Sequence, residues 1–496
     1  MVAVRAILAG LAAAALGAAL PAHAQVSLRG TLAPSPAATD SAAPAGTPAP
    51  GARAPDARGL PVPKDPFADP FTVEELESPT GAALPAAAPG TAGAPAAAGA
   101  SAEAAPPAPP KKKRKPPEED PWQAPGIAAG AFVLRPSVDV VGGYDSNPRG
   151  VQGGKGSSYV RTSAELQVQS DWSRNSFTAD LRGSYTDYFK AHDLDAPEAS
   201  GNTLLRLDVT PEVTATIALR GAITEQNPFT PGLPANLKGR PLVYSAGTTV
   251  GATWKPNRLS LSLDGLVDRY LYQDLKLTNG TTVSAADQDF TAYELKLRAG
   301  YDVTPDLTPF VQASINRHQY DLTLDASGFR RSSSGVAGVV GARFAPPGPI
   351  TAEGDVGYQD QRPDDSRLPD LRGPIFDLAV IYKLSPLTTI TLRGSSAIDE
   401  TTLPGSPGAL QYTTRLQIDH ALRRWLILSG AVGFERIDYT GVKLTQDLWS
   451  AELGLEWKLT PELALRLRAA HERLISTTLG QSYNDDIVEA GVRVTR

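Results

Sequence analysis

Cysteine is absent from this chain of 496 residues. Without a thiol the protein has no disulfide framework, no thiolate ligand for a metal and no cysteine that could carry a lipid. An exported protein avoids stray disulfides in an oxidising compartment in this way. The absence therefore agrees with export, although many cytosolic chains also have few cysteines.

An excess of positive charge is lacking as well. The formal net charge is −6, so the chain has no global basic field, and we expect no nucleic-acid partner. Beyond the amino-terminal segment the chain also lacks any run of about 18 continuous apolar residues, which excludes a transmembrane helix in the mature protein. A membrane-spanning form must then be a closed β-barrel, because only helices and closed sheets satisfy every backbone amide in hydrocarbon.

The amino-terminal segment has the features of a secretion signal. Arg5 precedes an apolar run over residues 6–20, and residues 22–24 (Ala-His-Ala) form a small-x-small cleavage pattern. This pattern predicts a signal peptide at residues 1–24. A buried alanine-rich helix is the alternative.

Residues 25–125 are dominated by alanine, proline, glycine, serine and threonine. Such a composition cannot bury enough apolar surface to offset the entropy of ordering, so we expect a disordered periplasmic segment. Its basic run at 111–115 is either a solvated charge run or a contact for anionic headgroups or cell-wall polymers. Cell-wall or polysaccharide-export components are the partners expected for this segment.

From about residue 126 onward, apolar and polar residues alternate, most clearly in residues 159–172, 259–264, 293–302 and 449–459. In the last of these, the odd-numbered positions are Trp449, Ala451, Leu453, Leu455, Trp457 and Leu459. The even-numbered positions are Ser450, Glu452, Gly454, Glu456 and Lys458. A helix would scatter these charges around its circumference, whereas a strand places them on one face. The pattern therefore predicts strands.

Two kinds of connection separate the alternating runs. Short turns, mostly with proline, are expected at 173–175, 210–212, 255–257, 304–306, 345–348, 385–387, 422–424 and 460–462. Longer polar loops are expected at 145–156, 191–200, 226–240, 273–287, 361–370, 401–408 and 476–484. Proline presets a tight turn and cannot lie in a central strand. Short turns at one rim and long loops at the other are typical of outer-membrane barrels.

The predicted fold for residues 126–496 is an all-β, closed antiparallel transmembrane barrel of about 18 strands, with 16–18 as the range. A soluble propeller is the alternative, but its blades need four short strands, and the runs here are about 10 to 14 residues long. We expect the outer membrane of a Gram-negative bacterium as the location. Lipids, lipopolysaccharide and the barrel-assembly machinery are the expected partners, and both chain ends would lie in the periplasm.

Aromatic residues near the ends of the expected strands indicate interfacial girdles. They are Tyr144, Trp172, Tyr185, Trp254, Tyr301, Phe310, Tyr382, Tyr412, Trp425, Trp449 and Trp457.

The candidate functional residues lie at the polar positions of the alternating runs, which would all point to the same face of the strands. The expected lumen-facing charges are Arg161, Glu165, Asp180, Arg182, Arg206, Asp208, Arg220, Asp264, Glu294, Lys296, Arg298, Arg393, Arg415, Asp419, Glu452, Glu456, Arg466 and Arg468. Facing lipid at mid-bilayer, each Arg or Lys would cost about 2–4 kcal/mol, whereas facing a watery lumen it costs little. The charges either line an open pore or pair as a structural ladder that narrows it. Both interpretations stay open.

Catalytic signatures do not emerge from the sequence. His192, His318, His420 and His471 are scattered without ligand spacing, and His23 leaves with the signal. The acid pairs Asp364-Asp365 and Asp485-Asp486 lack the spacing of a calcium loop, so solvated loop acids are the default and a cation contact is the alternative. We expect no enzyme, no cofactor and no metal centre.

Residues 132–138 (FVLRPSV) and 143–148 (GYDSNP) resemble the opening of the putative β-barrel porin 2 family of bacterial outer-membrane proteins. The resemblance covers residues 131–496 and implies an outer-membrane barrel. In that family the transported substrate is generally not established, and some members occur with exopolysaccharide export. One departure is the final residue, Arg496, where outer-membrane barrels commonly carry an aromatic residue read by the assembly machinery.

The function expected from these features is a porin-like channel for passive diffusion of small polar solutes, with the charged lumen setting selectivity. The alternative is a non-conducting structural or assembly barrel associated with exopolysaccharide export.

Overall fold

The computed structural model describes residues 122, 124–227, 229–234, 236–478 and 480–496. The signal peptide expected at 1–24, nearly all of the segment expected at 25–125 and its basic run at 111–115 lie outside these residues. Within the described part of the chain, no helix is long and apolar enough to cross a membrane.

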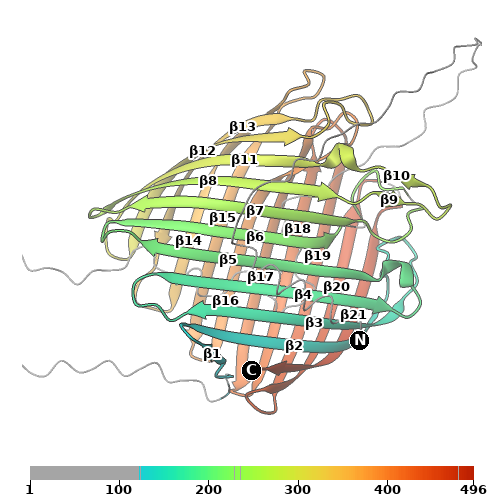
Figure 1. Cartoon of the computed structure of the whole chain (residues 1–496). Coiled ribbons are helices and arrows are strands. Elements are labelled where there is room, and N and C mark those ends of the chain that lie inside the picture. Colours follow the sequence, from blue (N-terminus) through green and yellow to red (C-terminus); the bar gives the residue numbers. More distant parts are fainter. Residues whose placement is uncertain (1–121, 123, 228, 235, 479) are drawn as a thin grey trace, which may run out of the picture.

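Eighteen long strands form one closed antiparallel barrel (Figure 1). They are β2 (Phe132–Asp145), β3 (Ser157–Ser170), β4 (Ser176–Tyr188), β5 (Ala196–Asp208), β6 (Val213–Glu225), β7 (Leu242–Trp254), β8 (Leu259–Tyr272), β11 (Phe290–Tyr301), β12 (Leu307–Tyr320), β13 (Ser333–Phe344), β14 (Ile350–Pro363), β15 (Leu371–Ser385), β16 (Thr388–Glu400), β17 (Gly408–Arg423), β18 (Leu426–Tyr439), β19 (Leu444–Lys458), β20 (Leu463–Ser476) and β21 (Tyr483–Thr495). Each pairs with its neighbours in chain order, and β2 pairs with β21 to close the ring. The strand count expected from the sequence is confirmed.

A short strand, β1 (Ile127–Ala129), completes the seam. It pairs with residues 132–134 of β2, along the edge that β21 leaves free beyond Ser137. The β1–β2 turn contains Gly130 at φ +63°, a conformation that L side chains rarely adopt. The backbone amide of Arg496 donates to the carbonyl of Pro136 at 3.0 Å. Both ends of the barrel domain therefore meet at the short-turn end.

The eight short turns occur where the sequence indicated them. In three of them the sequence Thr-Pro-acid recurs, and the hydroxyl oxygens of Thr210, Thr304 and Thr460 each accept a hydrogen bond at 3.3 Å from the backbone amide two residues later. Proline fixes φ at the second turn position, and the threonine hydroxyl satisfies an amide that the ladder leaves unpaired. This combination explains why the strands reverse there.

The long-loop end carries nine connections, as eighteen strands with eight short turns require, and seven of them were located from the sequence. Residues 321–332 and 440–443 were missed, and residues 196–200, expected in a loop, belong to β5. Residues 273–289 also form the small hairpin of β9 (Leu275–Lys276) and β10 (Thr282–Val283) and the 3₁₀ turn η2 (Ala286–Gln288). A second 3₁₀ turn, η1 (His192–Leu194), lies between β4 and β5.

The two faces of the wall differ as the alternation predicted. Outward positions carry exposed valine, leucine and isoleucine, for example Leu453 on β19 at 62% exposure. On the same face, Trp449 and Trp457 flank Leu453 at a separation of eight residues, and Tyr293 and Tyr301 are spaced equally on β11. Eight residues span about 26 Å of strand, or about 20 Å of height at a tilt near 40°. That height suits an apolar band between two aromatic girdles.

The girdle position expected for Phe310 is wrong. Phe310 lies directly opposite Gly300 and Gly341 in the ladder, on the same face as Arg298, and only 4% of it is exposed. The guanidinium carbon of Arg298 lies 3.4 Å from the centre of the Phe310 ring. The position of Phe310 near the end of a strand did not determine which way its ring points. Successive residues of a strand point to opposite faces, and Phe310 falls among the residues that point inward.

Candidate functional site: the inner wall and the loop end

Cross-strand register places every charge of the expected lumen set on one face. Residues directly opposite in adjacent strands share a face, and such pairs can be followed around the ring, as from Arg182 to Glu165 to Ser137 and Thr495. The charges on this face are Arg161 and Glu165 on β3, Asp180 and Arg182 on β4, Arg206 and Asp208 on β5, Arg220 on β6, Asp264 on β8, Glu294, Lys296 and Arg298 on β11, Arg393 on β16, Arg415 and Asp419 on β17, Glu452 and Glu456 on β19, and Arg466 and Arg468 on β20. The exposed aliphatic residues occupy the opposite face.

Asp139 is the centre of one ion-pair network on this inner face. It accepts from Arg493 at 3.0 Å and from Arg466 at 3.1 Å. Arg493 also reaches Glu165 at 3.5 Å, and Arg182 lies 3.4 Å from Glu165. Sequence reasoning missed Asp139 and Arg493, although both lie on the polar parity of their strands.

Glu489 is the centre of a second network. It accepts from the Tyr159 hydroxyl and pairs with Arg161 at 3.1 Å and Arg468 at 3.3 Å. Arg468 continues to Glu452 at 3.3 Å, and Arg415 reaches the same glutamate at 3.0 Å. The two networks line the wall from β17 through the seam to β4. Asp180 pairs with Arg182 at 2.8 Å and Glu456 lies 3.8 Å from Arg466, so the six arginines of the networks meet six acids.

These ion pairs run along the wall and do not cross the lumen. Many of them reach over one intervening strand, and small residues there make room. Arg220 on β6 and Asp268 on β8 pair at 2.6 Å across Gly247 on β7. A Cβ at Gly247 would lie 2.1 Å from Asp268 Oδ1 and 2.7 Å from Arg220 Nε. The long side chains therefore lie over the glycine, along the wall.

The wall from β8 to β15 is different, because six acids share its inner face with four bases, Lys296, Arg298, Arg343 and Lys383. Arg298 pairs with Glu353 at 2.8 Å, and Lys296 pairs with Glu294 at 3.3 Å. Asp264, Asp355 and Asp377 share this face, and Asp355 lies directly opposite Asp377 in the ladder. Like charges in facing positions repel each other, so this wall presents negative charge to the lumen.

At the long-loop end, the connection between β6 and β7 turns inward. Phe229 in this loop is 7% exposed and packs with Ile437, Leu474 and Tyr483 on the wall of β17–β21. Gln446 Nε2 donates to the carbonyl of Phe229 at 2.7 Å. The expected loop at 226–240 was correct in position, but nothing in its local pattern indicated an attachment more than 200 residues away.

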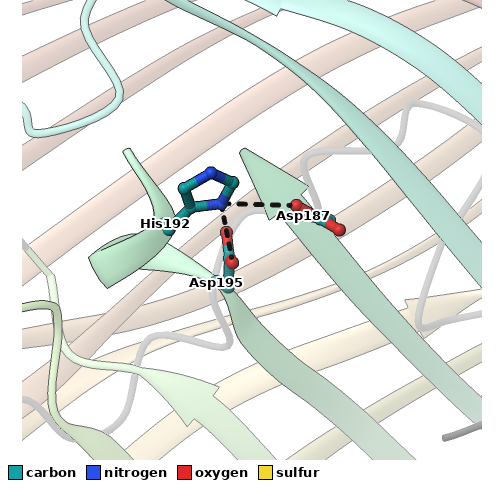
Figure 2. A group of neighbouring side chains, drawn as sticks. All are labelled: Asp187, His192 and Asp195. Atoms are coloured by element: carbon teal, nitrogen blue, oxygen red, sulfur yellow. Dashed lines mark ion pairs between the residues drawn. The ribbon is translucent and has the colours of Figure 1, made fainter. Parts of the chain in front are cut away.

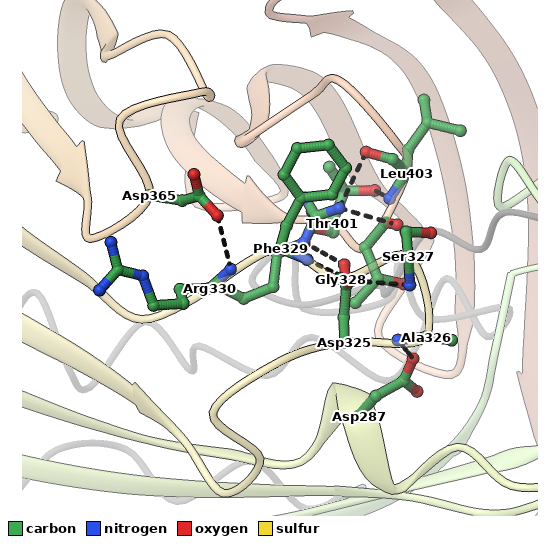
Figure 3. Close-up of polar contacts among 12 residues, drawn as sticks. Asp287, Asp325, Ala326, Ser327, Gly328, Phe329, Arg330, Asp365, Thr401 and Leu403 are labelled. Atoms are coloured by element: carbon green, nitrogen blue, oxygen red, sulfur yellow. Dashed lines mark hydrogen bonds and ion pairs between the residues drawn. The ribbon is translucent and has the colours of Figure 1, made fainter.

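Arg331 ties the β12–β13 loop to the β16–β17 loop (Figure 3 shows the surrounding contacts). Its Nε donates to Asp325 Oδ2 at 2.6 Å. Its two terminal nitrogens donate to the carbonyls of Thr401, Thr402, Leu403 and Ser406 at 2.5–3.2 Å. Five acceptors for five guanidinium N–H groups fully satisfy a side chain that is almost completely buried.

Asp365 extends the same assembly of loops (Figure 3). Its Oδ2 accepts from the backbone amide of Arg330 at 3.0 Å, and its carboxylate pairs with Arg367 at 2.7 Å. Hydrogen bonds from the Arg367 side chain, and then from the Arg330 amide, hold the pKa of Asp365 well below its usual range. The Arg317 side chain lowers the pKa of Asp364 in the same way. The acid pair noted in the sequence is therefore bound to arginines.

His318 has a structural position that the sequence did not reveal. It is 1% exposed and contacts Glu400 at the end of β16, and the Tyr320 hydroxyl donates to the same glutamate at 3.4 Å. This buried contact joins β12 to β16 beneath the Arg331 cluster. His420 contacts Thr388 at 2.9 Å and His471 contacts Asp486 at 2.7 Å, so these three histidines lie on separate strands.

His192 lies between two aspartates at the rim (Figure 2). Its Nδ1 is 3.4 Å from Asp195 Oδ2 and 3.8 Å from Asp187 Oδ1. The backbone amide of Tyr188 fixes Asp195 with a hydrogen bond at 2.7 Å. The His192 and Asp187 side chains are mostly exposed, and contacts between exposed polar groups of this kind stabilise a structure little.

Comparison with solved structures finds several similar chains. The siderophore receptor PirA from Pseudomonas aeruginosa is 10% identical with a TM-score of 0.36, covering 73% of this chain and 80% of that one. The outer membrane protein opdK from the same organism is 12% identical with a TM-score of 0.38, covering 73% and 99%. OccK10 (OpdN), also from that organism, is 14% identical with a TM-score of 0.37, covering 74% and 99%. At these values the likenesses carry no conclusion about this chain.

Comparison with curated protein sequences finds no match. A family model described as "Putative beta-barrel porin 2" matches residues 120–496, which includes every strand of the barrel. The match begins somewhat before residue 131, where the sequence resemblance was expected to start. Because the match covers most of the sequence and the whole closed barrel, the chain belongs to the putative β-barrel porin 2 family.

Proposed function

We propose that the protein is an outer-membrane channel for the passive diffusion of small polar solutes. The observation that carries this proposal is the inner face, where charged residues occur on strands all around a closed ring of eighteen. Their ion pairs run along the wall, as between Arg220 and Asp268. Such a face requires water, and a continuous polar wall through an apolar band is what a diffusing polar solute needs.

The orientation in the membrane is part of the proposal. The long-loop end would face the cell exterior and the short-turn end the periplasm, as in outer-membrane barrels in general. The outward aromatic girdles would contact lipid headgroups. At the long-loop rim the outward-facing pairs Arg269–Asp321 and Arg317–Asp364 would lie among lipopolysaccharide headgroups.

We also propose that the channel prefers cations. Asp264, Asp355 and Asp377 make no ion pair within 4.0 Å in the described part of the chain, whereas the arginines of the seam wall are matched by acids. Unpaired carboxylates in a low-dielectric pore raise the local concentration of cations. In a KCl gradient, the wild-type reversal potential should have the sign of K⁺ selectivity.

The combined substitution Asp264→Asn, Asp355→Asn and Asp377→Asn tests this preference. It should lower the ratio of K⁺ to Cl⁻ permeability towards unity or below. Asp187→Asn removes an aspartate that faces outward at the rim and should leave the ratio unchanged. A wild-type channel selective for Cl⁻, or an unchanged ratio in the triple variant, contradicts the cation preference.

A second candidate is a non-conducting structural or assembly barrel associated with exopolysaccharide export. The inward loops favour it, since Phe229 and Arg331 hold polypeptide over part of the barrel mouth. Recordings in planar bilayers separate the two candidates. The channel predicts stepwise currents from the purified protein, either full-length or lacking residues 25–121, and absence of current from both forms contradicts it.

A further inference from the structure

The loop between β6 and β7, residues 226–241, extends across the mouth of the barrel. It begins and ends on neighbouring strands, yet Phe229 contacts the cluster formed by Ile437, Leu474 and Tyr483 on β18, β20 and β21. Those strands lie on the other side of the β2–β21 seam. An ordinary surface loop would stay above its own two strands.

The contacts at Phe229 are those of a packed core. The ring is 7% exposed, and Ala409, Tyr439 and Leu444 join the same apolar cluster. Gln446, itself 1% exposed, donates to the Phe229 carbonyl at 2.7 Å. An aromatic ring buried in this way contributes much of the free energy that holds a segment in place.

The other arm of the loop is held as well. Arg240 pairs with Glu225 at 3.1 Å and donates to the carbonyl of Pro148 in the β2–β3 loop. Gly239, at φ +78°, passes so close to the carbonyl of Asp193 that a Cβ would lie 2.3 Å from that oxygen. The loop is thus attached to the wall at Phe229 and to the β2–β3 loop at Arg240, and it packs closely against the β4–β5 loop at Gly239.

We propose that loop 226–241 sets the size limit of the diffusion pathway and that Phe229 is the residue that holds it across the mouth. This inference rests on the proposed channel function. Polar solutes small enough to pass beside the loop cross the barrel, and larger ones are excluded. Releasing the Phe229 ring lets the loop move outward and admits larger solutes, without changing the charges of the wall.

Liposome swelling with neutral saccharides of increasing mass tests the inference. Wild-type protein should pass the smallest saccharide and exclude larger ones, whereas Phe229→Ala should shift the cut-off to larger saccharides. The control is Phe189→Ala, which removes an equal ring from the β4–β5 loop, where it is 57% exposed. An unchanged cut-off in Phe229→Ala overturns the inference.

Limited trypsin digestion supplies a readout that does not depend on conduction. Lys238 is the trypsin cleavage site within the described part of the loop, since Arg240 precedes Pro241 and trypsin does not cleave before proline. Phe229→Ala should raise the cleavage rate at Lys238 by about tenfold or more, because a buried ring is lost. Faster cleavage together with an unchanged cut-off shows that Phe229 anchors a loop that does not limit size, and it overturns the inference.

If neither wild type nor variant passes any saccharide, the result contradicts the proposed channel function, and the proposed size limit is contradicted with it. Digestion still shows in that case whether Phe229 anchors the loop. If only the proposed size limit is wrong, the smallest saccharide still passes through wild type, Phe229→Ala and Phe189→Ala, and the cut-off is the same in all three.

Discussion

At the scale of single residues, glycine has a spatial role on the inner face. Gly247 and Gly251 lie under the carboxylates of Asp268 and Asp264, and a Cβ at either position would meet the carboxylate oxygen at 2.1 Å. The sequence shows such glycines within alternating runs but not what covers them. The alternation of apolar and polar residues along one strand shows which face of the sheet a side chain points to. Which side chain of a neighbouring strand it contacts depends on the register between the strands, and the sequence does not show the register.

Gly247→Ala tests this role. The new methyl group must displace the Arg220–Asp268 pair, so we expect the free energy of unfolding to fall by about 1–3 kcal/mol. Urea titration of the protein refolded in lipid measures the change. Ala246→Gly on the outward face of the same strand is a comparison that leaves the ion pair in place. Equal stability of Gly247→Ala and wild type contradicts the crowding at this position.

The side chain of Arg331 holds the β12–β13 loop and the β16–β17 loop together through its hydrogen bonds. Arg331→Gln leaves Asp325 buried without its cation and the carbonyls of residues 401–403 and 406 without their donor. Breaking a buried charged contact of this kind costs about 3–5 kcal/mol. Hydrogen exchange in residues 401–407 should therefore speed up. Arg330→Gln, at an exposed neighbouring position, should leave that exchange unchanged.

At the scale of elements, strands and loops differ in how far the sequence predicts them. Strand positions, turn positions and the polar face followed from alternation and from Thr-Pro-acid turns, because these signals are local. The inward path of loop 226–241 and the Arg331 cluster did not follow. Their partners lie 217 and about 70 residues away in sequence, so only the closed ring brings them together.

The loop assembly should resist mild acid. Hydrogen bonds from Arg269, Arg317 and Arg367 lower the pKa values of Asp321, Asp364 and Asp365, respectively. With the folded-state pKa below the unfolded value of about 3.9, the unfolded state binds more protons in acid. The stabilisation is therefore fully present above about pH 4 and is lost as the pH falls through the lower folded-state values.

Hydrogen exchange in residues 321–332 and 364–370, corrected for intrinsic rates, measures this pH dependence. Protection should be constant from pH 7 to about pH 5 and should decline below about pH 4. Loss of protection between pH 7 and pH 6 would show that other groups hold the loops.

At the scale of the whole molecule, one physical condition organises the chain. Every backbone amide in the apolar band is paired within the ring of eighteen strands. Neighbouring side chains consequently face lipid and lumen in turn, with Leu219 outward and Arg220 inward on β6. The sequence predicted this arrangement because burial against lipid selects aliphatic residues at every second position. It could not predict which inner charges pair, since the pairs join strands far apart in sequence.

The most direct test of this alternation uses the absence of native cysteine. Ala218→Cys places a lone thiol on the inner face of β6, and Leu219→Cys places one on the outer face one residue later. Each variant in proteoliposomes is treated with a charged, water-soluble thiol reagent, and the rate of modification is measured. The account predicts rapid modification of Ala218→Cys and none of Leu219→Cys. Modification of Leu219→Cys with Ala218→Cys protected would contradict it.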